Sequence, residues 1–307
     1  MSGIGIVLNP YSKLHRKDPD KMTRMSYIVG DKGSCKQTLD LQDLRRVAEE
    51  FKTRDIDILA IAGGDGTIHV ALTAFINVYG EKPLPKIALL RGGTMNTISN
   101  GINNRGSPEK LLSNLIHQYH EDVAFEEIQI DLMKVNDEYG FLFGCGMVYR
   151  FLELYYKGTT PSPKKAALLL ARTAASSLLN GRFACELFKR FDVEVTVDGK
   201  KWAFKNYVTL MAGSVPSLGF GTKVFYKAMQ PRIFHGMGFS MTPRTMVCEL
   251  PKLAFGKPSH HPDLLDDAFQ EMVLEFGEPT PYYLDGDMLE ETKIVRISLG
   301  PRITIVK

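Results

Sequence analysis

The chain has 307 residues, of which 44% are hydrophobic and 24% charged, the balance of a folded globular protein with one large domain or two of ordinary size. Its net charge of +3 is too small to indicate a nucleic-acid-binding protein. The four cysteines lie far apart with no Cys-x-x-Cys pair, so neither a zinc site nor a disulfide framework is indicated and reduced thiols are expected.

The first part of the chain alternates strand and helix patterns. Apolar runs predict strands at 4–8, 57–62 and 86–90, and helical spacing predicts helices from Asp40 to 51, from about 67 to 79, and from Ser107 to about 118. This alternation favours a parallel sheet covered by helices. Because ligands of such sheets bind at the carboxyl ends of the strands, the residues that follow each strand are the candidates for a site.

The pattern changes after about residue 123 to short strand-like runs separated by turns. These runs cover 125–135, 139–144, 193–197, 201–204, 205–212, 268–276 and 294–299, with Asp137-Glu138 as the first turn. Asp198-Gly199 predicts a hairpin, and this half reads as mostly antiparallel. The segment 213–265 shows little periodicity and predicts long loops. The last residues read as two strands joined at Gly300-Pro301.

One predicted helix, Lys164 to Leu179, interrupts this antiparallel half. It contains the longest apolar segment, which Arg172 interrupts and which is too short to span a bilayer. Lys164 and Lys165 leave two interpretations open, an amphipathic membrane contact and a core-packed helix, of which core packing is favoured. The N-terminus has no leader-like pattern, so we expect a cytoplasmic protein, with peripheral contact to the inner membrane face as an option.

The string Gly63-Gly64-Asp65-Gly66-Thr67 lies where a buried strand should end and a helix begin. Glycines let the backbone approach a ligand closely, and a helix start supplies free N–H groups and a positive dipole end. Together these features indicate a phosphate site. Asp65 would repel phosphate unless a metal ion mediates or the acid handles a proton during phosphoryl transfer. A generic glycine-rich turn is the alternative interpretation.

Three further positions carry candidate polar groups. Gly92-Gly93-Thr94-Met95-Asn96 follows the next strand, where Thr94 and Asn96 would hold phosphate oxygens or serve only as turn and cap residues. Asp285-Gly286-Asp287 indicates a hairpin turn, or a carboxylate that accepts a proton from a substrate hydroxyl. Asp131 lies among apolar strand residues and needs a partner or a role, unless it is exposed at a domain edge.

Five elements, taken in order, resemble the diacylglycerol kinase catalytic-domain family, which includes sphingosine kinases and bacterial lipid kinases. They are Asn9-Pro10, Gly63–Thr67, Gly93–Asn96, Ile130-Asp131 and Leu284–Asp287. The resemblance implies a three-layer α/β ATP-binding domain over 1–125 and 293–307, and an antiparallel β-sandwich domain for the lipid over 126–292. It implies ATP and Mg²⁺ as cofactors, a lipid substrate at a membrane surface and no nucleic acid, and it is compatible with a homodimer.

The resemblance also implies the site residues. The nucleotide set would be Asn9, Pro10, Ser12, Thr38, Gly63, Gly64, Asp65, Gly66, Thr67, Gly93, Thr94 and Asn96. Asp65 would act with Mg²⁺ near the phosphates, and Asp131 would help to organise that network. Asp287 would be the general base on the lipid hydroxyl.

Several positions differ from the family's usual pattern. Glu is usual where Asp287 stands, Asn-Asp where Asn96-Thr97 stands, and Asn-Glu where His69-Val70 stands. Phe234-His235-Gly236 stands where bacterial members often have an Asp-Asp-Gly that binds a second Mg²⁺, so that structural metal is not expected. Two alternatives to a lipid kinase stay open: an NAD kinase, and a nucleotide- or lipid-binding protein that has lost catalysis.

Overall fold

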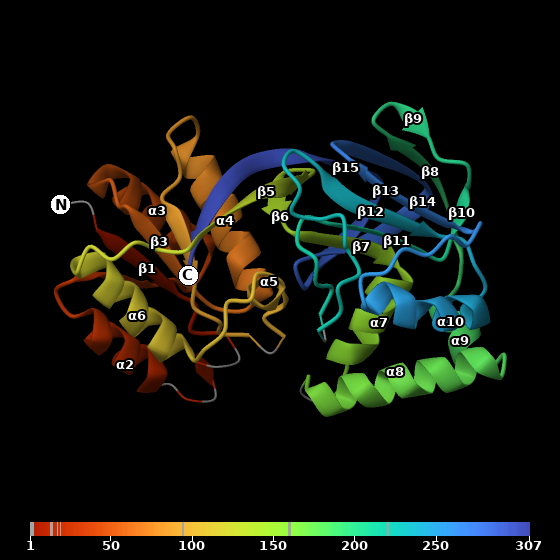
Figure 1. Cartoon of the computed structure of the whole chain (residues 1–307), viewed down its shortest axis with the longest axis horizontal. Helices are drawn as coiled ribbons and strands as arrows, with labels where there is room; N and C mark the ends of the chain where they lie inside the picture. The colour runs from red at the N-terminus through yellow and green to blue at the C-terminus, as the bar shows by residue number, and fades with distance from the viewer. Residues whose placement is uncertain are drawn as a thin grey trace. The chain divides into compact units, whose positions relative to one another are not determined.

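The structure is a computed structural model that describes residues 3–12, 15–16, 18, 20–93, 95–158, 161–219 and 221–307. The chain divides into two compact units (Figure 1). Unit 1 comprises Met1–Ile130 and Pro301–Lys307, and unit 2 comprises Asp131–Gly300. Within the described ranges, no helix combines the length and the apolar character needed to cross a membrane.

Unit 1 contains a parallel sheet in the order β4-β3-β1-β2. Its strands are β1 (Ile4–Leu8), β2 (Gly33–Gln37), β3 (Ile58–Ala62) and β4 (Lys86–Leu89), and its helices are α2 (Asp20–Val29), α3 (Leu41–Arg54), α4 (Asp65–Tyr79), α5 (Thr97–Gly101) and α6 (Pro108–His120). The last residues of β15 (Asp287–Val306) extend the sheet, because Ile305 pairs in parallel with Ile87 of β4.

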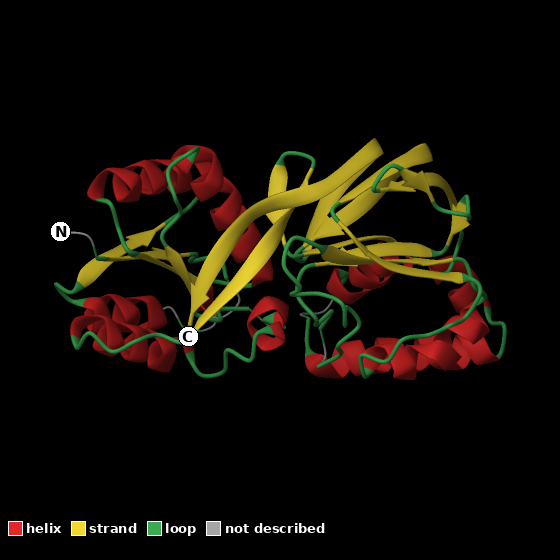
Figure 2. Ribbon diagram, turned by 45° about the horizontal axis from the view of Figure 1, so that its top comes forward, coloured by secondary structure: helices red, strands yellow, loops and turns green. Residues whose placement is uncertain are grey.

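Helices cover both faces of this sheet (Figure 2). Ile4, Ile6 and Leu8 of β1 lie in a core that includes residues of α2 and α6. Gly5 faces the other way, where a Cβ atom would lie only 2.6 Å from the ring of Phe51 of α3. Successive strand residues point to opposite faces, so α3 covers the face away from α2 and α6. The predicted α/β class of the N-terminal part is confirmed.

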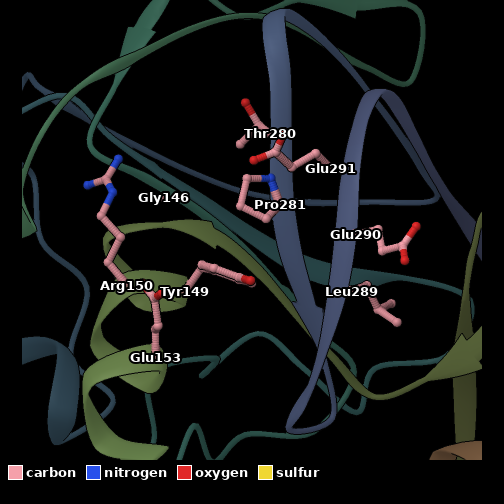
Figure 3. A pocket seen from close by; sticks show the side chains of 9 residues that line it. All are labelled: Gly146, Tyr149, Arg150, Glu153, Thr280, Pro281, Leu289, Glu290 and Glu291. Atoms are coloured by element: carbon pink, nitrogen blue, oxygen red, sulfur yellow. The ribbon is translucent and has the colours of Figure 1, made fainter. Parts of the chain in front are cut away.

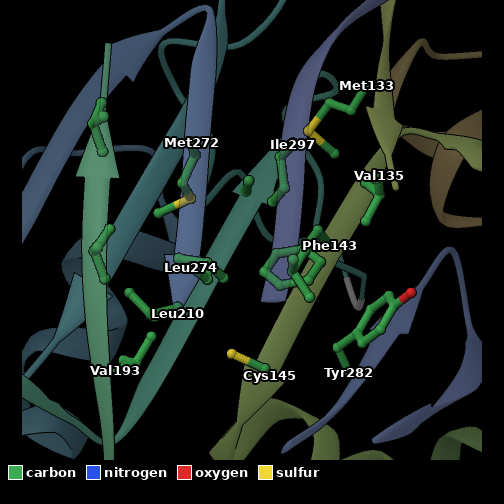
Figure 4. Packing of buried hydrophobic residues seen from close by; sticks show 14 of the residues in the cluster. Met133, Val135, Phe143, Cys145, Val193, Leu210, Met272, Leu274, Tyr282 and Ile297 are labelled. Atoms are coloured by element: carbon green, nitrogen blue, oxygen red, sulfur yellow. The ribbon is translucent and has the colours of Figure 1, made fainter. Parts of the chain in front are cut away.

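Unit 2 is built mainly from antiparallel strands, as predicted. They are β5 (Glu127–Val135), which starts in unit 1, β6 (Glu138–Gly140), β7 (Leu142–Gly146), β8 (Phe191–Val197), β9 (Lys200–Lys201), β10 (Asn206–Tyr207), β11 (Thr209–Gly213), β12 (Phe234–Phe239), β13 (Leu264–Phe269), β14 (Glu271–Leu284) and most of β15. Residues 272–276 of β14 pair with β8, and residues 282–284 pair with β7. Side chains such as Leu274, Phe143 and Ile297 fill the core between these strands (Figure 4).

The described residues of unit 2 also form the helices α7 (Met147–Tyr156), α8 (Pro163–Leu178), α9 (Arg182–Leu187) and α10 (Pro243–Ala254). Ser162 and Thr242 cap α8 and α10, each with a proline at the first helical position. In Figure 1, α8 lies on the outer side of α7 and α10, away from the strands. Leu168 of α8 and Leu179, which directly follows it, are exposed, so the favoured prediction of a core-packed helix is wrong for them.

The prediction of long loops over 213–265 is wrong, because this segment contains β12, α10 and the start of β13. The glycines of β12 weaken the strand pattern, yet Gly236 leaves space for the ring of Phe269, which a Cβ atom would approach to 2.1 Å. Pro251 inside α10 similarly obscures the helical pattern. The two predicted C-terminal strands are one strand, β15, which continues through Gly300.

Two smaller boundaries also differ. The first turn of this half lies at Asn136-Asp137 rather than at Asp137-Glu138, because Val135 pairs with Glu138. The predicted strand 268–276 is divided into β13 and β14 at Gln270, whose N–H, like that of Glu271, is donated to the Asp198 side chain.

Candidate functional site

The four parallel strands of unit 1 end at one edge of the sheet, where the predicted nucleotide residues follow them. The N–H of Asn9 donates to Ala62 of β3 at 3.2 Å, and the N–H of Thr38 donates to Leu8 of β1 at 3.1 Å. The N–H of Leu90 donates to Ile61 at 2.9 Å, which brings the end of β4 beside the end of β3. Residues from four separate parts of the sequence therefore meet at this edge.

Two glycine loops at this edge, the first at Gly63–Thr67 and the second at Gly92–Asn96, lie in direct contact. The N–H of Gly92 donates to the carbonyl of Gly63 at 2.5 Å. A Cβ atom on Gly92 would lie 2.8 Å from the Cα of Gly63, and one on Gly93 would lie 2.7 Å from the Cα of Gly64. The close packing of the two loops is thus enough to require glycine at these positions. Thr94 lies outside the described residues.

Asn9 joins the end of β1 to the start of α4. Its Nδ2 donates to Oγ1 of Thr67 at 2.8 Å, and its Oδ1 accepts from the N–H of Tyr11 at 2.8 Å. The N-cap of α4 is Gly64, which has no side chain to accept from the first-turn N–H groups. Those N–H groups and the helix dipole suit an anion such as phosphate at this position.

Asp65 lies half-buried at the first position of α4 and reaches the second loop. Its Oδ2 accepts from the N–H of Thr97 at 2.9 Å, and its Oδ1 accepts from the N–H of Ile98 at 3.2 Å. Burial raises the pKa of this carboxyl. The hydrogen bonds from the two N–H groups and from the Thr97 side chain, and the charge of Arg91, act in the opposite direction. The acid that would repel phosphate is therefore held against the N-terminus of α5.

Asn96 closes the second glycine loop on itself. Its Oδ1 accepts from the N–H of Gly93 at 3.0 Å, and its Nδ2 donates to the carbonyl of Gly93 at 3.1 Å. Its φ of 45° lies in the left-handed region, which Asn tolerates better than most residues. These contacts are those of a turn residue, the alternative interpretation of this side chain.

Arg91 is a residue of this edge that the sequence analysis missed. Its Nη1 donates to Oδ1 of Asn100 at 2.9 Å and to the carbonyl of Asn104 at 2.5 Å. Its charge lowers the pKa of Asp65, so it also contributes to the electrostatics of the site. The available signal was a basic residue between a buried strand and a glycine turn.

Three other predicted nucleotide residues lie near Asn9. Pro10 follows Asn9 directly, and the N–H of Ser12 donates to the carbonyl of Asn9 at 3.2 Å. The Ser12 side chain is buried, and its Oγ accepts from the N–H of His15 at 3.4 Å. Thr38 is buried at the end of β2. The structure therefore brings Asn9, Pro10, Ser12 and Thr38 into one neighbourhood of unit 1.

The other predicted acids belong to unit 2. Asp131 is buried in β5, where its Oδ2 accepts from the N–H of Arg232 at 2.7 Å. Asp285, in the turn between β14 and β15, is 1% exposed and accepts from the N–H groups of Phe141 and Leu142 at 2.9 and 2.8 Å. Asp287 is half-buried at the start of β15 and pairs with Leu284.

An open pocket of about 630 Å³ lies beside this hairpin within unit 2 (Figure 3). Its lining combines the start of α7 with the hairpin strands: Gly146, Tyr149, Arg150, Glu153, Thr280, Pro281, Leu289, Glu290 and Glu291. Leu289 lies only two residues after Asp287 along β15. The pocket is therefore lined in part by the strand that begins at Asp287, the predicted general base.

The segment Phe234-His235-Gly236, where the family often has a metal site, instead contributes a buried His to an ionic cluster. The Nε2 of His235 lies 2.8 Å from Oδ1 of Asp266, and the Nζ of Lys227 lies 2.7 Å from the same oxygen. The hydroxyl of Tyr226 donates to Oδ2 at 2.5 Å. Although burial raises the pKa of Asp266, these hydrogen bonds lower it to about 2.

The described part of the chain contains no group of three or more His, Cys, Asp or Glu side chains that could hold a metal ion. Asp65 is the carboxylate at the glycine loops, and it accepts from the N–H groups of Thr97 and Ile98 and from the Thr97 side chain. A carboxylate can accept about four hydrogen bonds, so one acceptor position is left. Mg²⁺ commonly uses one or two carboxylates together with substrate phosphates and water. Asp65 therefore fits a Mg²⁺ ion that arrives with a nucleotide, but not an all-protein cage.

Comparisons with known proteins agree with this arrangement. Residues 4–128 match the sequence profile of the diacylglycerol kinase catalytic domain. Proteins of Staphylococcus aureus strains RF122 and MSSA476, each named "Putative lipid kinase", are 25% identical over 215 residues, which is 65% of this chain and 62% of theirs. The chain therefore matches less than two thirds of the length of these relatives.

Solved structures show the same fold. A crystal structure titled "putative diacylglycerol kinase" from Bacillus anthracis str. Sterne covers 99% of this chain and 96% of its own, with a TM-score of 0.75 and 17% identity. A second structure from that organism with a similar title has a TM-score of 0.72, also at 17% identity, over 99% and 97% of the two chains. The resemblance predicted from the motifs is confirmed: residues 4–128 match the diacylglycerol kinase catalytic domain, and the whole chain has the fold of these structures.

Proposed function

We propose that this protein is an ATP- and Mg²⁺-dependent lipid kinase that phosphorylates a hydroxyl of a diacylglycerol-like or sphingoid lipid. The observation that carries this proposal is the pair of packed glycine loops at the ends of β3 and β4, joined to β1 through Asn9 and Thr67. These features lie in the part of the chain that matches the catalytic domain. We further propose a cytoplasmic enzyme whose lipid substrate lies at a membrane surface.

Each group of site residues would have a separate role in the reaction. The N–H groups at the start of α4 would bind the phosphates of ATP, with Asn9 and Thr67 fixing the loop that presents them. Asp65 would contact Mg²⁺, which neutralises phosphate charge when bound. Asp287 would accept the proton of the lipid hydroxyl. Most of the rate enhancement would then come from positioning and charge neutralisation.

We assign ATP to unit 1 and the acceptor lipid to unit 2, in line with the predicted domains 1–125 with 293–307 and 126–292. The pocket beside the β14–β15 hairpin supports the second assignment, because residues of β15 just after Asp287 line it. The choice between a diacylglycerol-like and a sphingoid acceptor depends on the product that the assay identifies.

The test is a phosphorylation assay with purified full-length protein, Mg²⁺, labelled ATP and a total lipid extract, followed by identification of the product. We expect one labelled phospholipid and no NADP when NAD replaces the lipid. Asp287→Asn should lower the rate by about 100-fold or more without loss of ATP binding, because the proton acceptor is removed.

Two outcomes would contradict this proposal. NADP formation would identify an NAD kinase. ATP binding without lipid turnover, unrescued by Asp287→Glu, would identify a protein that has lost catalysis.

A further inference from the structure

Helix α8 exposes large apolar side chains and buries small residues, unlike a helix that packs in a core. Its buried residues are small: Ala166, Thr173 and Ser177. Leu168 is 73% exposed, and Leu179, directly after the helix, is 81% exposed. Amphipathic helices of globular proteins place large apolar residues inward, so this arrangement is reversed.

The exposed residues form one continuous stripe. At about 100° per residue, Lys164, Leu168, Ala171, Ala175 and Leu179 follow one another at spacings of four and three residues and therefore share a face. All five are exposed. Leu178, at 49% exposure, flanks this stripe, which we call the outer face of α8.

The inner side explains how α8 is held. Its small residues allow it to lie close to neighbouring helices of unit 2, and Oγ of Ser176 accepts from the N–H of Ala184 of α9 at 2.9 Å. Figure 1 shows α8 beyond α7 and α10, on the side of these helices away from the strands. The outer face is therefore presented on a fixed element and not on a loop.

The charged residues in the segment that contains α8 all have one sign. Residues 154–185 contain no Asp or Glu and five basic residues, Lys157, Lys164, Lys165, Arg172 and Arg182. Lys164 and Lys165 lie in the first turn of α8, where cations oppose the helix dipole and destabilise the helix. The Nζ of Lys165 donates to the carbonyl of Lys157 at 2.6 Å, whereas Lys164 is exposed. Helix stability therefore does not account for Lys164, whereas an anionic partner does.

We propose that the outer face of α8 docks on the surface of an anionic lipid bilayer. Exposed leucines between basic side chains match the acyl boundary and the headgroups of such a surface. A second copy of the chain is a poorer occupant, because it would bring two sets of five basic residues together without acidic partners on the same segment. That docking brings the protein to its substrate rests on the proposed lipid kinase function. The docking surface itself does not rest on that function.

The test is cosedimentation of the full-length protein with phosphatidylcholine vesicles, with and without phosphatidylglycerol. We expect binding only with phosphatidylglycerol, weakened by salt. Leu168→Gln with Leu179→Gln should reduce the partition coefficient about tenfold or more, because apolar contact is lost. Lys164→Gln with Arg172→Gln should remove the preference for phosphatidylglycerol. Tyr27→Gln with Leu41→Gln, at side chains of unit 1 that are 89% and 58% exposed, should bind as the wild type does.

Unchanged vesicle binding by the leucine variant, or no binding by the wild type, would overturn the proposal. So would a dimer in solution that the leucine substitutions dissociate. Kinase assays separate this result from the proposed function: the leucine variant should lose activity on lipid in vesicles and keep it on lipid in detergent micelles. Vesicle binding without kinase activity would overturn only the function, and kinase activity with unaltered binding of the variant would overturn only the docking surface.

Discussion

Two hairpins of unit 2 turn on the same dipeptide, Asp198-Gly199 between β8 and β9 and Asp285-Gly286 between β14 and β15. Both aspartates have φ near 47°, at 46° and 48°, and both glycines have positive φ, at 75° and 96°. Each turn contains two residues, because Val197 pairs with Lys200 and Leu284 pairs with Asp287. Each aspartate also accepts from two consecutive backbone N–H groups of another segment.

The hairpins differ in burial. Asp198 is exposed, whereas Asp285 is 1% exposed. The same sequence and the same contacts therefore give an ordinary surface turn in one place and a buried connection to β7 in the other. Asp285 accepts from the N–H groups of Phe141 and Leu142, whereas Asp287, two residues later, is half-buried. Asp65-Gly66 in unit 1 repeats the double contact at intermediate burial.

The largest expected effect is a difference in the free energy of unfolding between variants of the two hairpin aspartates. Asp285→Ala should lower the free energy of unfolding by about 4 kcal/mol, because two buried N–H groups lose their acceptor. Asp198→Ala removes the same contacts where water can replace them and should cost about 1 kcal/mol. Urea unfolding measures both, and Asp285→Asn, which keeps one acceptor, should lie between them. Equal losses at the two sites would contradict the role given to burial.

Asp65 extends the comparison to catalysis. Asp65→Asn keeps one acceptor oxygen but removes the charge, so we expect the rate of lipid phosphorylation to fall at least about 100-fold. The free energy of unfolding should change by only about 1 kcal/mol. Initial rates and urea unfolding distinguish the two effects, with Asp198→Asn as a control of unchanged rate. An active Asp65→Asn enzyme would leave this residue a purely structural role.

Asp266 is an acid whose partners are side chains and not backbone N–H groups, which allows the effect of its charge on stability to be measured. Its pKa of about 2 lies below the ordinary 3.8, so its contribution to stability is fully present above pH 3.8 and is lost as the pH falls toward 2. Asp266→Asn should therefore cost about 2 kcal/mol at pH 7 and progressively less below pH 3.8. Urea unfolding over this range checks the trend. A cost independent of pH would mean that the charge of Asp266 is not involved.

The smallest effect should be the same in both hairpins. Gly199→Ala and Gly286→Ala each place a side chain at positive φ, with only the hydroxyl of Tyr156 within 4 Å, at 3.7 Å from position 286. Each should cost about 1 kcal/mol in the free energy of unfolding. Thermal or urea unfolding of the two variants side by side measures this. A markedly larger loss at Gly286 would show that burial also affects the glycine of the turn.

Much of unit 1 could be predicted from the sequence, because its signals are local. Asp40 and Ser107 cap α3 and α6 as predicted, through hydrogen bonds to residues three positions further along. The buried strands read directly as apolar runs. The sequence analysis missed α2, β2 and α5 of unit 1, as well as β12 and α10 of unit 2. The last two carry glycines and a proline whose tolerance depends on neighbours far away in sequence.

By itself the sequence determined the alternation of β1, α3, β3, α4, β4 and α6 in unit 1, the turns at Asp198 and Asp285, and the motifs that resemble diacylglycerol kinases. Only the tertiary structure decided what those motif residues touch: Gly92 meets Gly63, and Asp65 meets the start of α5. It also decided that α8 turns its leucines outward. Spacing along a helix tells which residues share a face, whereas the packing of distant segments determines which face is covered.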